Sequence, residues 1–161
     1  MSNKIIHIGL PKTSTTHLQN NVLKKICEIE NLSYYGKQSD YTLSANHKLF
    51  HLKYSIAYDF EPEKINLGEN YLVSHEGLTG TDPFYWEKAS QKINKSLGDD
   101  VQILMVLRDP VTFLNSVYME ACISKGYFIK PERYFLENKN YLLPDNYPKF
   151  NIEKFSYINL I

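Results

Sequence analysis

The chain has no excess charge of either sign and very little cysteine. Its 161 residues include 18 basic and 18 acidic side chains, so the formal net charge is zero. A neutral chain has no long-range field that would favour nucleic acid or an anionic membrane surface, so any anion site must be local. The two cysteines, Cys27 and Cys122, lie far apart without metal-ligand spacing. This favours two free thiols in a reducing compartment over a disulfide or a zinc site.

Long apolar runs are absent as well. No stretch reaches the ~18 consecutive apolar residues of a membrane-spanning helix, and the apolar stretch near the N-terminus is too short for a signal peptide. We therefore expect a cytoplasmic protein without a membrane span. Hydrophobic residues make up 43% of the chain and charged residues 22%, which is the balance of one globular domain over residues 1–161.

Apolar strands and amphipathic helices alternate along this chain. Strands are predicted at residues 4–10, 32–36, 71–74 and 101–107. The helices are predicted from their apolar faces: Leu18, Val22, Leu23, Ile26 and Cys27; Trp86, Ala89, Ile93 and Leu97; Val111, Leu114, Val117, Tyr118 and Ala121. Residues 37–66 are predicted as helical pieces and loops. The alternation indicates an α/β fold, a three-layer sandwich of a parallel sheet flanked by helices, with ligands bound beyond the carboxyl ends of the strands.

The first strand runs into a turn that is rich in groups able to bind an anion. Lys12 is followed by four hydroxyl residues, Thr13, Ser14, Thr15 and Thr16, and a helix begins there. A helix N-terminus presents backbone N–H groups and a partial positive charge, which favour phosphate or sulfate. The segment "GLPKTSTT" lacks the second glycine of a Walker A loop, so an ordinary nucleoside triphosphatase is disfavoured. The alternative is a hydroxyl-rich helix cap beside a solvated lysine.

A second candidate anion site follows the last strand, in "LRDPVTFLNSVY". Arg108 comes at the end of that strand, and Ser116 lies about two turns into the next helix. An arginine fork together with a hydroxyl suits a second phosphate. Taken alone, Arg108 is equally well explained as a structural ion-pair partner of Asp109 or of another carboxylate. Two anion sites at strand ends indicate a ligand with phosphate groups at both ends of a nucleoside.

These segments resemble those of sulfotransferases that use 3′-phosphoadenosine 5′-phosphosulfate (PAPS), of the bacterial and carbohydrate type. "PKTSTTHLQ" is similar to the family's 5′-phosphosulfate loop and "RDPVTFLNSVY" to its 3′-phosphate motif, in the same order. "NYLVSHEGL" also resembles the family's central strand end. The resemblance covers residues 4 to about 127. It implies a P-loop-like sandwich, PAPS as donor and no metal. It also implies that the chain is a single sulfotransferase-like domain without the C-terminal part of the family fold.

The resemblance implies a role for each residue of the two motifs. Lys12 would contact the bridging oxygen and the sulfonate of the donor. The hydroxyl and backbone groups of Thr13, Ser14, Thr15 and Thr16 would hold the 5′-phosphate. Arg108 and Ser116 would hold the 3′-phosphate.

Sulfuryl transfer also needs a base for the acceptor proton. We assign this role to Glu76, with His75 as the competitor, because both follow the strand at residues 71–74. The alternative is that Glu76 is a solvated carboxylate and His75 a surface histidine. His7 is expected to be structural, and Asp109 to serve as a helix cap.

Three functions from different classes follow from this sequence. The first is transfer of a sulfuryl group to a hydroxyl or amine of a carbohydrate or another small acceptor. The second is a nucleotide-binding remnant of the family, with weak or no activity. The third is an atypical phosphotransferase, which would need an acidic residue at a strand end to hold magnesium.

Overall fold

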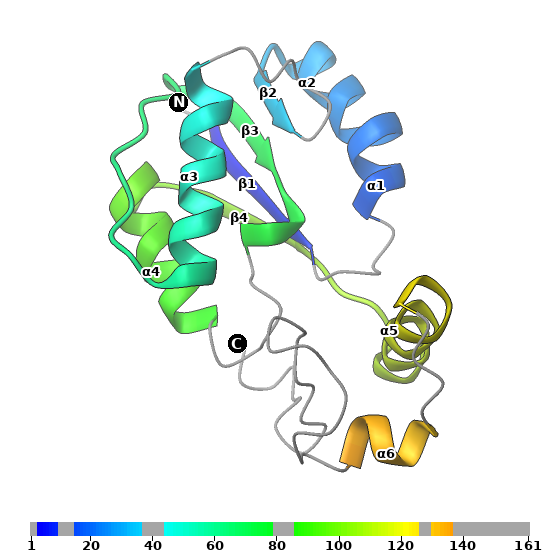
Figure 1. The fold of residues 1–161 in the computed structure, drawn as a ribbon. Helices are drawn as coiled ribbons and strands as arrows, with labels where there is room; N and C mark the ends of the chain where they lie inside the picture. Colours follow the sequence, from blue (N-terminus) through cyan, green and yellow to red (C-terminus); the bar gives the residue numbers. More distant parts are fainter. Residues whose placement is uncertain (1–2, 10–14, 37–43, 79–85, 126–129, 137–161) are drawn as a thin grey trace.

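The centre of the fold is a parallel sheet (Figure 1). The computed structural model describes residues 3–9, 15–36, 44–78, 86–125 and 130–136. In these residues the strands are β1 (Asn3–Gly9), β2 (Ser33–Gly36), β3 (Asn70–Ser74) and β4 (Gln102–Val106). Their order is β2-β3-β1-β4, and every pair is parallel. The predicted parallel α/β fold is confirmed, and so is the short strand that became β2.

The strand register places the carboxyl ends of β1, β3 and β4 along one edge of the sheet. Residue His7 of β1 is paired with Ser74 of β3, and Gly9 of β1 is paired with Val106 of β4. The central strand β1 therefore delivers the chain to this edge between its two neighbours. The segments that follow the three strands all begin at this edge, which is the edge where ligands bind in parallel α/β sheets.

Helices pack against both faces of the sheet (Figure 1). One face is covered by α3 (Ser44–Tyr58) and α4 (Trp86–Leu97). The other carries α1 (Thr15–Leu18), the π-helix η1 (Gln19–Leu23) and α2 (Lys24–Glu30). The 3₁₀-helix η2 (Glu76–Leu78) follows β3, and α5 (Pro110–Lys125) and α6 (Pro131–Leu136) follow β4. None of the described helices combines the length and the apolar character needed to cross a bilayer.

The helix α4 matches its prediction closely. Ala89, Ile93 and Leu97 are buried against the sheet. The helix ends at Gly98, whose φ of 99° is the left-handed conformation that glycine adopts without strain. Its amide donates to the carbonyl of Asn94 at 2.8 Å. Local helix signals were sufficient here because the apolar positions and the stop signal agree.

Residues 37–66 are predicted as helical pieces and loops, and within the described residues they contain one continuous helix, Ser44–Tyr58, followed by residues 59–66 outside any helix or strand. The outer face of α3 carries exposed aromatic residues, among them Tyr54 and Tyr58. Apolar residues on both sides of a helix weaken the periodic signal on which the prediction relied. The buried Lys92 of α4 links α4 to α3 and to the segment after it. Its amine donates to the carbonyl of Ser55 in α3 at 2.6 Å and to the carbonyl of Phe60 at 2.8 Å.

Two predicted helix faces also needed correction. In the helix after β1, Leu23 and Cys27 are buried as predicted, but Val22 and Ile26 are exposed. The buried positions there are spaced by four residues: Thr15, Gln19, Leu23 and Cys27. A π-helical turn, which has a longer repeat than an α-helix, shifts the buried face in this way. In α5 the predicted inward residue Val111 is exposed, whereas Phe113 is buried.

The strand β4 is less covered than its sequence predicts. Its apolar run indicated burial on both faces, yet Ile103 is 49% exposed and Leu104 41%. The reason is topological, because β4 pairs only with β1 within the described residues and so lies at the edge of that sheet. Cys27 is a free, buried thiol whose pKa is raised by burial; the side chain of Cys122 lies outside what is described.

Candidate functional site

The candidate site lies at the carboxyl edge of the sheet, where β1 meets α1. Lys12, Thr13 and Ser14 of the predicted anion loop lie outside the described residues. Thr15 is the first residue of α1 and is buried, whereas Thr16 is exposed to solvent. The strand and the helix that flank the predicted loop are therefore present. The position of the lysine itself remains a prediction.

Four polar residues, here called the polar floor, interact where β1, β2, β3 and η1 meet: His7, Gln19 and Ser74 are buried, and Tyr34 is partly buried. His7 and Ser74 are 0% exposed, and Nδ1 of His7 lies 2.7 Å from the hydroxyl oxygen of Ser74. Gln19 donates from its Nε2 to the carbonyl of Ser74 at 3.4 Å. The Tyr34 hydroxyl donates to the carbonyl of Gln19 at 3.3 Å, and burial raises its pKa. These contacts join β1, β2, β3 and η1.

Sequence reasoning found only part of the polar floor. His7 was predicted to be structural, and its buried contact with Ser74 fits that role. Gln19 and Ser74 were not predicted. Gln19 follows Thr15 by four residues, so the two side chains share one side of the helix. This spacing was the signal in the sequence that Gln19 would be buried together with Thr15. Its Oε1 atom is buried and has no hydrogen bond within the described part of the chain.

The two candidate bases follow β3 at the same edge. His75 is partly buried, and its Nδ1 accepts a hydrogen bond from the amide of Gly77 at 3.0 Å. The neutral imidazole then carries its proton on Nε2, so this nitrogen is a donor. Glu76 opens the 3₁₀-helix η2, and its side chain lies outside the described structure.

The second predicted anion site lies where β4 leads into α5. Arg108 is partly buried two residues beyond the end of β4. Asp109 caps α5, because its Oδ1 accepts from the Thr112 amide at 2.8 Å and from the Thr112 hydroxyl at 2.7 Å. These hydrogen bonds lower the pKa of Asp109, with a smaller contribution from the charge of Arg108. The predicted cap is thus confirmed. Ser116 is partly buried within α5.

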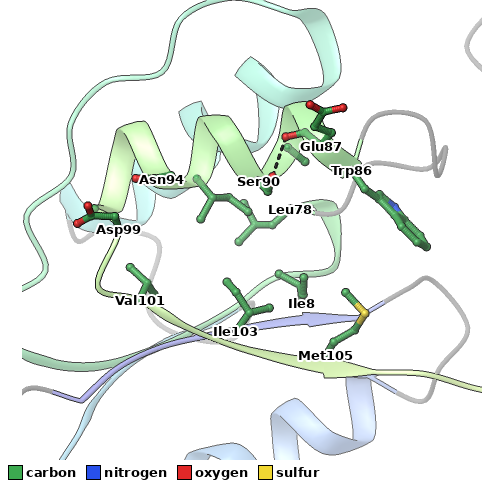
Figure 2. A pocket seen from close by; sticks show the side chains of 13 residues that line it. Ile8, Leu78, Trp86, Glu87, Ser90, Asn94, Asp99, Val101, Ile103 and Met105 are labelled. Carbon is green, nitrogen blue, oxygen red and sulfur yellow. Dashed lines mark hydrogen bonds between the residues drawn. The ribbon is translucent and has the colours of Figure 1, made fainter. Parts of the chain in front are cut away.

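A groove of about 480 Å³ lies between α4 and the sheet, on the face that α3 and α4 cover (Figure 2). Its walls are mainly apolar: Ile8, Leu78, Ile93, Val101, Ile103 and Met105. Figure 2 shows Trp86 and Met105 together at one end, whereas the carboxylates of Glu87 and Asp99 point away from the groove. Its volume lies within the range of ~300–1,000 Å³ that is usual for small-molecule sites. Since Ile8 and Met105 are near the ends of β1 and β4, the groove reaches the same edge of the sheet.

A metal site has no support in the described residues, because no three histidine, cysteine or acidic side chains gather there in a ligand-like group.

We also compared the chain with known proteins. No protein-family model, no curated protein and no solved structure matches it.

Proposed function

We propose that this protein is a PAPS-dependent sulfotransferase with a P-loop-like fold. The observation that carries the proposal is the adjacency of β1 and β4 in the sheet. The predicted 5′-phosphosulfate loop follows β1, and the predicted 3′-phosphate residue Arg108 follows β4. The two motifs are separated by about 90 residues of chain, and the strands that they follow lie side by side in the sheet.

The register supports one ligand that spans both motifs. Gly9 and Val106 are paired, so the chain leaves the sheet at the same level on both strands. Neighbouring strands lie about 4.8 Å apart, which is well within the length of a nucleotide with phosphates at its 3′ and 5′ positions. In the proposed complex Lys12 and the turn from Thr13 to Thr16 hold the 5′ end, and Arg108 with Ser116 holds the 3′-phosphate.

In the proposed reaction, the bond between the donor's sulfur and its 5′-phosphate oxygen breaks while a bond from sulfur to the acceptor oxygen or nitrogen forms. Lys12 and the backbone N–H groups at the start of α1 stabilise the negative charge that develops on the departing 5′-phosphate. The acceptor loses a proton, and the other product is adenosine 3′,5′-bisphosphate. The acceptor in this proposal is a glycan or another small hydroxyl or amine compound.

We assign the acceptor proton to Glu76. His75 is less suited to remove it, because its Nδ1 already accepts from the Gly77 amide and its Nε2 carries a proton. A histidine with that tautomer donates a hydrogen bond, so His75 would orient an acceptor oxygen instead. The carboxylate of Glu76, one residue further along at the same edge, would then accept the proton.

Phosphoryl transfer is the less favoured alternative. It would require an acidic residue at a strand end that is available to hold magnesium, and the Oδ1 of Asp109 already accepts from the amide and the hydroxyl of Thr112 at the start of α5. A nucleotide-binding protein without transferase activity has the same donor site, so only turnover distinguishes it from the leading proposal.

Calorimetry with three ligands tests the donor site. We expect adenosine 3′,5′-bisphosphate to bind without metal, and to bind more tightly than adenosine 5′-phosphate, since it engages both motifs. ATP with magnesium should bind weakly. Metal-dependent ATP binding without bisphosphate binding would instead favour the phosphotransferase. Bisphosphate binding without transfer to a panel of sugar acceptors would favour the inactive nucleotide-binding protein.

A further inference from the structure

The groove between α4 and the sheet runs along one face of β4. Val101, Ile103 and Met105 line it, and their spacing of two residues places their side chains on the same face of the sheet. Figure 2 shows these three side chains and that of Ile8 pointing from the sheet toward α4. The backbone from Val101 to Met105 spans about 13 Å, at ~3.3 Å per residue. The groove therefore extends along the length of β4.

The walls of this groove select against charged and strongly polar molecules. The described residues that line it include no lysine, arginine or histidine. Glu87 and Asp99 are exposed, and their carboxylates point away from the groove (Figure 2). The hydroxyl of Ser90 already donates to the carbonyl of Glu87 at 2.7 Å. A phosphate in the groove would lose water without meeting a cation, and a sugar would bury hydroxyl groups with few partners. An uncharged apolar body matches these walls.

The groove is built partly from the turn that carries the candidate bases. Leu78 lines the groove and ends η2, the 3₁₀-helix that Glu76 begins. Leu78 is completely buried, and its amide donates to the carbonyl of His75 at 3.3 Å. Met105, at the other wall, is the last residue but one of β4. A molecule that fills the groove would therefore present one end at the carboxyl edge of the sheet, where this turn lies.

Trp86 supplies a hydrogen-bond donor at that end. It is the only tryptophan of the chain, and it lies with Met105 at one end of the groove (Figure 2). Its indole nitrogen is buried and has no hydrogen-bond partner within the described residues. An indole N–H is a donor only, and a buried one usually has a partner. A hydroxyl oxygen of a bound molecule at this end would be that partner.

We propose that the groove binds the linear apolar chain of an uncharged amphiphile, whose hydroxylated head lies at the carboxyl edge of the sheet. This molecule is the acceptor if the proposed sulfuryl transfer is correct. Long-chain alcohols and alkyl glycosides share this chemistry. In the transfer, the head oxygen bonds to the donor's sulfur while the bond from sulfur to the 5′-phosphate oxygen breaks, and the proton of the head goes to Glu76.

Tryptophan fluorescence measures binding at the groove directly, because Trp86 has no second tryptophan to mask it. The titrations use the full chain and two series below their micelle concentrations: linear alcohols from butanol to decanol, and glucosides that carry the same alkyl chains. In both series the affinity should rise about three- to fourfold with each added CH₂, since each buries one more methylene. Glucose oligomers without an alkyl chain should leave the emission unchanged.

Two neighbouring positions of β4 provide a matched pair of variants. Ile103→Asp places a carboxylate in the groove, at a position exposed enough to keep it solvated in the free protein, and should lower the affinity for decanol at least about tenfold. Leu104→Asp is the control. Leu104 is similarly exposed but does not line the groove, because adjacent side chains of a strand point to opposite faces. This variant should bind decanol normally.

A third variant tests the indole donor. Trp86→Phe keeps an aromatic ring but removes the N–H, and should weaken decanol about two- to tenfold, as expected for one hydrogen bond. Calorimetry replaces fluorescence for this variant.

Several outcomes would overturn the proposal. One is an affinity that does not depend on chain length, and another is an equal loss in Ile103→Asp and Leu104→Asp. A third is binding of plain glucose oligomers that changes the Trp86 emission and is lost in Ile103→Asp. Competition between decanol and adenosine 3′,5′-bisphosphate would mean that the groove takes the donor's adenine instead.

Failure of the amphiphile site and failure of the proposed enzyme give different results. If the alkyl compounds bind in the groove but adenosine 3′,5′-bisphosphate does not bind, the amphiphile site stands and the sulfotransferase proposal fails. If the bisphosphate binds and the alkyl compounds do not, the groove is not the acceptor site, although the donor site stands. If both bind together, transfer from PAPS to decanol or to decyl glucoside identifies the head that reacts.

Discussion

The two corners at which a strand turns into a helix are built differently. The elements on either side of the corner from β1 to α1 are joined by the polar floor, where His7 and Ser74 are completely buried and Gln19 and Tyr34 join in. The corner from β4 to α5 is open, with Leu107 50% exposed and Val111 75%. It is held by contacts between Asp109 and Thr112, three residues apart. The first corner thus depends on residues from several elements, whereas the second is formed locally.

This difference suggests a division of tasks in the proposed site. A buried hydrogen-bonded network lies in low dielectric and holds its members rigidly. That suits the corner where charge develops during transfer, because transition-state stabilisation depends on preorganised groups. A locally capped corner needs only to present Arg108 to a phosphate that does not react.

The largest effect should come from the reacting corner. Lys12→Ala should lower sulfuryl transfer at least about a hundredfold, since an electrostatic group that acts on the transition state contributes roughly 3 kcal/mol. Transfer from PAPS to a glycan acceptor is the measurement. Lys25→Ala on the exposed side of α2 is the matched control and should leave the rate unchanged. A normal rate in a folded Lys12→Ala protein would remove this lysine from the mechanism.

The second corner should affect binding and not chemistry. Arg108→Ala should weaken adenosine 3′,5′-bisphosphate about ten- to a hundredfold, because a hydrogen bond to a charged group contributes about 1.5–3 kcal/mol. Ser116→Ala should weaken it less. Binding of adenosine 5′-phosphate, measured by the same calorimetry, should hardly change in either variant. Equal losses for the two ligands would refute the assignment of the 3′-phosphate.

The smallest predicted effect is on stability, and it compares the two corners directly. Ser74→Ala removes the hydroxyl next to the buried Nδ1 of His7, so the free energy of unfolding should fall by about 1–3 kcal/mol. Urea denaturation measures this loss. Ser33→Ala, at an exposed position of β2, should change little. Asp109→Ala should have a smaller effect than Ser74→Ala, because the cap is exposed and its contacts are local.

The dependence of stability on acid pH tests the cap at Asp109 separately. The pKa of Asp109 is lower in the folded protein than its ordinary value of 3.8. Its stabilising contribution is therefore complete above the ordinary pKa and is lost as the pH falls through the folded pKa. The stability difference between the unchanged protein and Asp109→Ala should disappear in that acid range. A difference that persists well below it would mean that the cap does not depend on the carboxylate charge.

The sequence predicted those parts of the fold that depend on neighbouring residues. The helix α4 and its stop at Gly98 were predicted correctly, as was the cap at Asp109, since apolar spacing and capping operate within a few residues. The prediction was less specific for α3, whose exposed Tyr54 and Tyr58 obscure its periodicity. It also misjudged β4, because the apolar pattern of a strand does not reveal whether that strand lies at an edge.

By itself, the sequence determined the alternation of strands and helices and the types of residue at the strand ends. Both are local properties of the chain. Tertiary structure alone decided that β4 lies beside β1, which makes neighbours of the two predicted anion motifs. It also buried Gln19 and Ser74 with His7, and it left Tyr54 and Tyr58 exposed on α3. Strand order and burial depend on contacts between residues far apart in the chain, and no local pattern encodes them.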